Sequence, residues 1–125
     1  MTENEISKQV VDAAFKIHTR LGPGLLKSVY EATLAYELKR RGLRIVRQKP
    51  TPVIYEEVQL EEGFRADLIA EDTVIIELKS VETIAPVHKK QVLTYLRLTN
   101  LKLGLLINFS EALIKDGIYR IVNGL

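Results

Sequence analysis

The stretch FRADLIAEDTVIIELKS, residues 64–80, decides the fold, because it is typical of two short strands joined by a tight acidic turn. Over residues 64–70 the side chains alternate with the period of two that a strand requires. Residues 74–76 are all β-branched, which also favours a strand. The sequence therefore predicts a β-hairpin near the middle of the chain.

The length of the turn in this hairpin decides where Asp67 points. Glu77 and Lys79 are two residues apart on the second strand, so they project from one face of it. If the turn has three residues, 71–73, Asp67 lies directly opposite Glu77 on that face, with the Cβ atoms roughly 5 Å apart. A two-residue turn would instead pair Asp67 with Ile76 and place the two carboxylates on opposite faces, because a slip of one residue inverts every side chain.

The three-residue turn would bring Asp67, Glu77 and Lys79 together. Two carboxylates held that close, beside aliphatic neighbours, destabilise the fold unless a cation lies between them or one of them is protonated. A hard divalent ion, Mg²⁺ or Mn²⁺, suits such a pair because these ions prefer oxygen ligands. We therefore expect a metal site on this hairpin.

The arrangement of Asp67 followed by Glu77-x-Lys79 resembles the PD-(D/E)xK nuclease signature, and the chain as a whole resembles the GxxExxY group of that superfamily. The Glu-x-Lys element alone is a weak motif, since it is common on exposed strands. The likeness is carried by four blocks that cover most of the chain: residues 21–38 (LGPGLLKSVYEATLAYEL), 64–80, 86–110 (PVHKKQVLTYLRLTNLKLGLLINFS) and 115–123 (KDGIYRIVN).

This resemblance implies an α/β, restriction-endonuclease-like fold with a central mixed β-sheet flanked by helices. It also implies a hydrolase that cleaves phosphodiester bonds of nucleic acid, DNA rather than RNA, with Mg²⁺ or Mn²⁺. The catalytic residues would be Asp67, Glu77, Lys79 and Glu31, and the metal ligands among them Asp67, Glu77 and Glu31. Gln91 and Tyr95 resemble the Q-x-x-x-Y element of RecB-type nucleases. The residues expected to contact nucleic acid are Gln91, Tyr95, His88 and Arg65.

Two residues of the first block leave alternatives open. Glu31 lies on an otherwise apolar stripe of a helix expected over residues 28–41, so it either caps that helix or points toward Asp67 and Glu77. The GxxExxY pattern has Glu where this chain has Lys27, and an ammonium group cannot ligate Mg²⁺. If that position binds metal in relatives, this chain lacks a ligand. If it caps the helix or faces solvent, nothing chemical follows.

The remaining elements follow from local signals. A capping box at Thr2-x-x-Glu5 predicts a first helix that ends near Leu21, and Pro86 predicts the start of a third that ends near Asn100. Further strands are expected over residues 43–48, 53–60, 103–109 and 117–123. Breaks between strands are expected at residues 49–52 and 61–63, where Pro and Gly occur.

Composition predicts a single domain, residues 1–125, of ordinary soluble character. Of its residues 46% are hydrophobic and 27% charged. No apolar run approaches the ~20 residues that span a bilayer, and the N-terminal TENEISK is polar, unlike a signal peptide, so we expect a cytoplasmic protein. The absence of Cys excludes disulfides, thiolate metal sites and thiol nucleophiles. With two His residues, the chain also lacks the ligand set of a His-rich metal hydrolase.

The distribution of basic residues along the chain indicates which partners the protein could bind. The net charge is only +2, but six basic residues crowd residues 39–49, a cluster that can follow phosphates or simply be solvated. A domain this small covers few nucleotides, so a homodimer would be a natural way to enlarge the footprint. The rival to the nuclease interpretation is a catalytically inactive, nuclease-like module that binds nucleic acid or protein, in which Lys79 neutralises the acid pair.

Overall fold

The structure, a computed structural model, describes the backbone of residues 1–125 and every side chain except that of Glu62. Five strands form one mixed sheet in the order β1-β2-β3-β4-β5, in which β3 and β4 are parallel and the other neighbours antiparallel. Among the described residues, no helix combines the length and the apolar character needed to cross a membrane. The elements are α1 (Glu3–Leu21), α2 (Lys27–Arg40), β1 (Ile45–Tyr55), β2 (Val58–Ala70), β3 (Val74–Lys79), α3 (Pro86–Thr99), β4 (Leu103–Asn108), a 3-10 turn (Ile114–Gly117) and β5 (Ile118–Val122).

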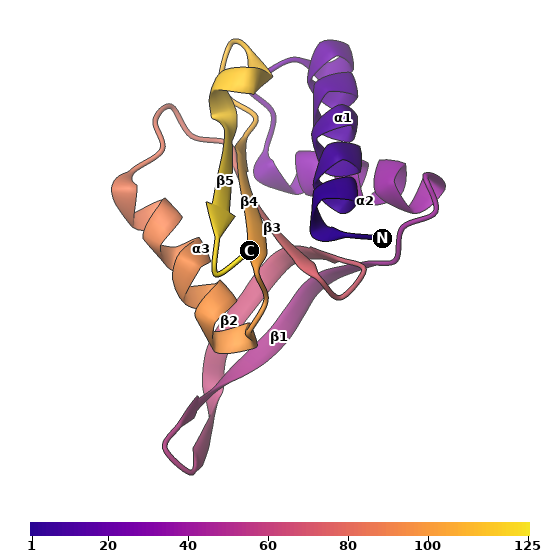
Figure 1. The fold of residues 1–125 in the computed structure, drawn as a ribbon. Coiled ribbons are helices and arrows are strands. Elements are labelled where there is room, and N and C mark those ends of the chain that lie inside the picture. Colours follow the sequence, from indigo (N-terminus) through magenta and orange to yellow (C-terminus); the bar gives the residue numbers. More distant parts are fainter.

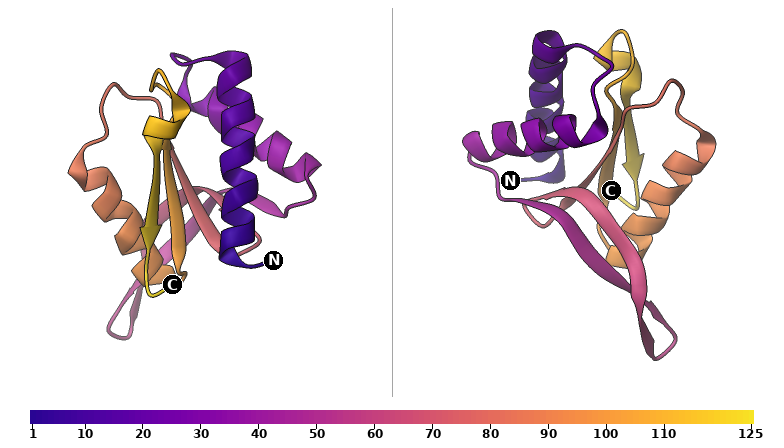
Figure 2. Two further views of the ribbon diagram at one scale, coloured as in Figure 1. Left: turned by 45° about the horizontal axis from the view of Figure 1, so that its top comes forward. Right: turned by 180° about the vertical axis from the view of Figure 1, so that it is seen from behind.

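The sheet lies between two helical layers, with α1 and α2 on one face and α3 on the other (Figures 1 and 2). On the α1–α2 face, Leu34 belongs to the same buried cluster as Leu68 and Ile76. On the α3 face, Leu96 belongs to a second cluster with Ile75. The central strands β3 and β4 are consequently covered on both sides, which suits the near-continuous apolar run of β4. The predicted α/β fold with a flanked mixed sheet is confirmed.

The turn between α1 and α2 places the N-terminus of α2 beside the end of β3. The hydroxyl of Tyr30 donates a hydrogen bond to the carbonyl oxygen of Gly22 (2.6 Å) and accepts one from the backbone N–H of Leu25 (3.1 Å). Its ring stacks on Phe109, with centroids 4.4 Å apart. Ser80, just after β3, donates to the carbonyl oxygen of Leu25 (2.6 Å). These contacts fix the first turn of α2 against the sheet.

The β1–β2 hairpin differs from the prediction. The expected breaks at residues 49–52 and 61–63 are wrong, because β1 continues through both prolines and the chain turns only at Glu56-Glu57. Proline is tolerated here because β1 is an edge strand, whose outer N–H groups have no ladder partner to lose. Gly63 is also accommodated within β2, where a Cβ would clash with the carbonyl oxygen of Thr51. The resulting hairpin projects as an arm beyond the rest of the sheet (Figures 1 and 2).

Candidate active site

The turn between β2 and β3 has three residues, so the first of the two predicted registers is confirmed. Ala70 pairs with Val74, and the ladder continues in the same register to Leu68 and Ile76. Glu71 and Asp72 adopt positive φ angles of 53° each, which closes the turn. The next residues in this register are Asp67 and Glu77, which therefore face one another across the two strands.

Beyond the pair formed by Leu68 and Ile76 the strands separate, and two carboxylates replace the missing ladder bonds. The backbone N–H of Asp67 donates to Oε1 of Glu77 (3.1 Å). The backbone N–H of Leu78 donates to Oδ2 of Asp67 (2.8 Å). Each carboxylate thus bonds the backbone of the opposite strand. Both residues are buried, with exposed fractions of 2% for Asp67 and 8% for Glu77.

This confinement changes the protonation of Glu77. Burial raises the pKa of Glu77 from its ordinary value of 4.5 to about 8, and the negative charge of Asp67 adds to the rise. The hydrogen bond from the Asp67 backbone and the charge of Lys27 act in the opposite direction. Among the described residues, no donor bonds to Oε2 of Glu77, and this oxygen is not sealed from solvent. A cation at Oε2 would therefore favour the ionised carboxylate.

The cation that meets the acid pair is Lys27, the first residue of α2. Its Nζ lies 2.8 Å from Oδ1 of Asp67, and its side chain is 41% exposed. Burial by itself would lower the pKa of Lys27, but the hydrogen bond to Asp67 and the charges of Asp67, Glu77 and Glu31 together raise it. The binding-module interpretation predicted that Lys79 neutralises the acid pair. This is wrong, because Lys79 forms no ion pair with any described side chain.

Glu31 points toward the strands and does not cap its helix. Residue Leu26 precedes α2 without a side-chain cap, and Glu31 is buried, with an exposed fraction of 5%. Its Oε2 accepts hydrogen bonds from Nε (3.2 Å) and Nη2 (3.1 Å) of Arg47. Its Oε1 accepts one from Nε2 of Gln48 (2.7 Å), and the same Nε2 donates to Oδ1 of Asp67 (3.0 Å). A single amide thus joins Glu31 to Asp67.

Sequence reasoning missed two residues of this site, Lys27 as a partner of Asp67 and Gln48 as the bridge. Gln48 has a positive φ of 51° within β1, and the pairing of β1 with β2 skips it. This left-handed conformation is uncommon outside Gly, Asn and Asp, so no local pattern predicts it. For Lys27 a signal existed, since it departs from the GxxExxY pattern at this position.

The residues expected on α3 lie in different surroundings. Tyr95 is half-buried and stacks on Phe64 with centroids 3.9 Å apart. Burial raises the pKa of the Tyr95 hydroxyl, and the charges of Glu77 and Asp67 raise it further. Gln91 lies one turn earlier and is exposed. Nδ1 of His88 accepts a hydrogen bond from the backbone N–H of Ala85 (3.1 Å) and so caps the helix.

Part of the basic cluster is neutralised within the chain. Arg65, also expected to contact nucleic acid, is exposed and donates to the carbonyl oxygen of Gln48 (3.3 Å). Of the six basic residues in 39–49, three arginines form ion pairs: Arg41 with Glu37, Arg44 with Glu71 and Asp72, and Arg47 with Glu31. The other three, Lys39, Arg40 and Lys49, are exposed and have no such partner among the described side chains.

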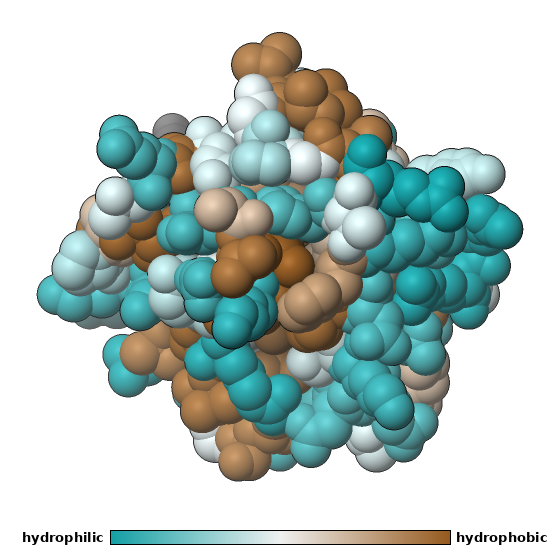
Figure 3. All heavy atoms as spheres, turned by 90° about the horizontal axis from the view of Figure 1, so that it is seen from above, coloured by the Kyte–Doolittle hydropathy of each residue, from teal (hydrophilic) through white to brown (hydrophobic). Residues whose placement is uncertain are grey.

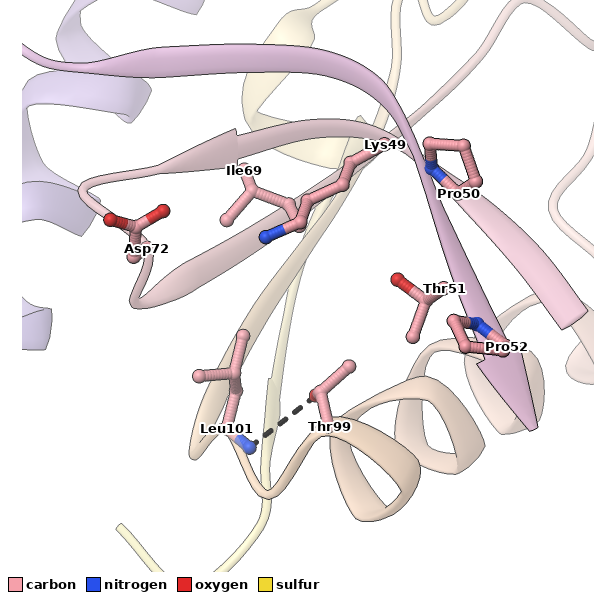
Figure 4. Close-up of a pocket in the computed structure, with 8 residues that line it drawn as sticks. All are labelled: Lys49, Pro50, Thr51, Pro52, Ile69, Asp72, Thr99 and Leu101. Atoms are coloured by element: carbon pink, nitrogen blue, oxygen red, sulfur yellow. Dashed lines mark hydrogen bonds between the residues drawn. The ribbon is translucent and has the colours of Figure 1, made fainter. Parts of the chain in front are cut away.

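One pocket lies at the start of α2, beside residues that contact Asp67. It has a volume of about 330 Å³ and is lined by Lys27, Ser28, Glu31 and Gln48. A second pocket, of about 340 Å³, is lined by Lys49, Pro50, Thr51, Pro52, Ile69, Asp72, Thr99 and Leu101 (Figure 4). Neither pocket is lined by Asp67 or Glu77. The first is the one connected to the acid pair, because Lys27 and Gln48 in its lining both contact Oδ1 of Asp67.

The surface beside the pocket at the start of α2 carries apolar side chains. Leu25, Leu26 and Val29 at the start of α2 are exposed, and Leu26 is 75% exposed. Seen from above, hydrophobic residues lie at the top, in the centre and in the lower part of the view, and hydrophilic residues surround them (Figure 3). Lys27 therefore extends from a well-exposed segment toward the buried acids.

The donor atoms fit a hard divalent ion in their chemistry. Asp67 and Glu77 supply carboxylate oxygens, which Mg²⁺ and Mn²⁺ prefer. Both oxygens of Glu31 are already bonded, to Gln48 and Arg47. In the part of the chain that the structure describes, no three acidic or histidine side chains are grouped to hold a metal by themselves. The acid pair supplies the candidate ligands, and Asp67, Glu77 and Glu31 as metal ligands stay a prediction.

Comparison with known proteins gives one match. Residues 4–121 match the family model described as the PD-(D/E)XK nuclease superfamily, which covers nearly the whole chain. No curated protein and no solved structure matches the chain significantly. The finer resemblance to the GxxExxY group is compatible with this match and stays a prediction.

Proposed function

The chain belongs to the PD-(D/E)XK nuclease superfamily, and from this premise we propose that it is a metal-dependent nuclease that hydrolyses phosphodiester bonds of DNA. The proposed ion is Mg²⁺ or Mn²⁺, and the proposed catalytic unit is a single domain, residues 1–125. The observation that supports it best is the meeting of Asp67 and Glu77 where β2 and β3 separate. Two buried carboxylates at such short range favour a cation between them.

Asp67 and Glu77 would hold the ion, and the chain orients both before any ion arrives. The Leu78 N–H fixes one oxygen of Asp67, and the Asp67 N–H fixes one oxygen of Glu77. Each acid is left with an oxygen that does not bond the opposite strand. When bound, the ion would polarise the scissile phosphate and lower the pKa of a water molecule. Preorganised ligands of this kind reduce the reorganisation that the reaction requires.

Lys79 is the proposed partner of the reacting phosphate. It follows Glu77 by two residues on β3, so both side chains leave the same face of the strand. Its ammonium forms no ion pair with a described side chain. An unpaired ammonium beside the acids would orient the attacking water or stabilise the negative charge that develops on the phosphate.

The α3 residues are proposed to position the nucleic acid. Gln91 and Tyr95 are four residues apart and therefore lie on one side of the helix. Tyr95 is half-buried and stacks on Phe64, and Gln91 is exposed one turn away. His88 and Arg65 are proposed as further contacts to the strand. His88 already uses Nδ1 to cap the helix, which leaves Nε2 for a ligand.

A second candidate function is supported by the Lys27 ion pair. Because the ammonium of Lys27 already lies 2.8 Å from Asp67, the acid pair is partly neutralised without a metal ion. A nuclease-like module that binds nucleic acid or protein without cleaving it would be stable in this form. This candidate predicts binding that does not depend on divalent ions.

A cleavage assay separates the two candidates. Linear double-stranded, single-stranded and branched DNA, and matching RNA, are incubated with the protein in Mg²⁺, Mn²⁺ or EDTA. The nuclease predicts cleavage that requires the ion and falls at least about 100-fold in Asp67→Asn and Lys79→Met. Lys16→Met is the matched control, since Lys16 pairs with Glu37 elsewhere on the surface. Metal-independent gel shifts without cleavage would support the binding module, and the mass from light scattering tests the proposed homodimer.

A further inference from the structure

We propose that Lys27 occupies the cation position beside Asp67 in the metal-free protein, and that a divalent ion is held there only after the ammonium has moved away. Lys27 would then set the affinity of the site for metal. The inference rests on the proposed function, because it takes the acid pair to be the metal site.

Lys27 contacts the oxygen of Asp67 that an incoming ion would bind. Oδ2 of Asp67 is bonded to the backbone N–H of Leu78 (2.8 Å). Oδ1 is contacted by Nζ of Lys27 (2.8 Å) and by Nε2 of Gln48 (3.0 Å). An ammonium at this distance and a dication on the same oxygen would repel one another strongly in a site with little water. The two cations therefore compete for Oδ1.

Lys27 can leave without a change in the fold. Its side chain is 41% exposed and lines the pocket of about 330 Å³ at the start of α2. The residues on either side of it, Leu26 and Ser28, are exposed. A lysine stem has several rotatable bonds, so the ammonium can turn toward solvent while α2 stays in place. Asp67 would keep its bonds to Leu78 and Gln48, so the carboxylate would remain oriented.

Lys27 also lies where its charge acts on the whole cluster. Besides Asp67, the carboxylates of Glu77 and Glu31 attract it. Glu31 has its own cation, Arg47, and does not depend on Lys27. Removal of the Lys27 charge would therefore leave Asp67 and Glu77 as the uncompensated acids. In this state the acid pair would have its highest affinity for a divalent ion.

The direct test is a titration with Mn²⁺, followed by the electron paramagnetic resonance of the free ion, at fixed pH and ionic strength. We expect Lys27→Met, which keeps the length of the side chain and removes its charge, to bind Mn²⁺ about tenfold more tightly than the wild-type protein. Lys27→Arg keeps the charge and should stay within a few-fold of wild type. Lys16→Met is the matched control, because Lys16 is 40% exposed and pairs with Glu37 at 2.9 Å. An unchanged affinity in Lys27→Met would overturn the inference.

A second measurement follows Lys27 itself. The protein is acetylated briefly at its lysine amines, and mass spectrometry measures the extent of acetylation at each lysine. A lysine held in an ion pair is acetylated less than one that is free in solvent. Saturation with Mn²⁺ should increase the labelling of Lys27 several-fold and leave that of Lys16 unchanged. If labelling of Lys27 does not rise at saturating Mn²⁺, the ammonium remains on Asp67 and acts as a permanent substitute for the ion, which would refute displacement.

The outcomes distinguish this inference from the proposed function. Tighter Mn²⁺ binding by Lys27→Met, with no cleavage of any nucleic acid by either protein, would support displacement and refute the nuclease. Metal-dependent cleavage with equal Mn²⁺ affinities in both proteins would support the nuclease and refute displacement. Absence of Mn²⁺ binding in both proteins at millimolar concentration would refute the inference.

Discussion

Replacement of Glu77 by Gln should stabilise the metal-free protein. The amide has the shape of the carboxyl group and keeps an oxygen to accept the hydrogen bond from the Asp67 backbone. The substitution removes the negative charge of Glu77, which burial and the charge of the neighbouring Asp67 both disfavour. The substitution therefore removes a destabilising group while leaving the packing of β2 and β3 unchanged.

The magnitude follows from the pKa of Glu77. In the folded chain this pKa is raised to about 8, against an ordinary value of 4.5 that applies to the unfolded chain. Between pH 4.5 and pH 8 the folded chain binds the proton of Glu77 more tightly than the unfolded chain does. The free energy of unfolding therefore falls as the pH rises through this range, and it levels off above about pH 8. At about 1.36 kcal/mol for each pH unit, the ionisable group destabilises the protein by about 3 kcal/mol at pH 7.

The assay is urea unfolding, followed by circular dichroism in EDTA at pH 5, 6, 7 and 8. Glu77→Gln should exceed wild type in stability by about 1 kcal/mol at pH 5 and by more than about 3 kcal/mol at pH 8. Glu37→Gln is the control of opposite sign. The hydrogen bond from Lys16, together with Arg41, lowers the pKa of Glu37, so its charge stabilises the fold at neutral pH. Loss of that charge should destabilise the protein.

The reasoning would be refuted if Glu77→Gln were no more stable than wild type at pH 8, or if the difference did not grow with pH. Either result would mean that the ionised Glu77 is not disfavoured where it lies. The same variant should lose metal-dependent cleavage, since an amide is a poorer ligand than a carboxylate. A group that destabilises the fold and is needed for the reaction is typical of a functional site.

Two further predictions concern the scaffold. Tyr30→Phe should lower the free energy of unfolding by about 1–3 kcal/mol in urea, because Gly22 and Leu25 lose their hydrogen-bond partner in the turn that positions α2; an unchanged midpoint would contradict this. Gly104→Ala should destabilise by about 1–3 kcal/mol, because the added Cβ would lie 2.6 Å from Cγ1 of Val92 on α3. A double variant with Val92→Ala should recover part of that loss, and equal losses in both would count against the close contact.

The hairpin shows where sequence reasoning succeeded and where it failed. The sequence predicted that a three-residue turn would oppose Asp67 and Glu77, and the structure has this turn and not the two-residue alternative. The arm was misjudged because Pro and Gly were taken as breaks, although an edge strand tolerates them. Whether β1 is an edge strand depends on the order of all five strands, which no local pattern contains.

The sequence by itself determined the helices and the central strands, since these depend on periodicity and on local start and stop signals. It left two registers open for Asp67 and Glu77, and the pairing of β2 with β3 decided between them. Only the tertiary structure decided which cation reaches that pair. Lys27 and Asp67 are far apart in the chain, and their contact exists because the turn held by Tyr30 sets the start of α2 beside the gap between β2 and β3. The partner of a buried charge depends on distance in space, which only the packed chain defines.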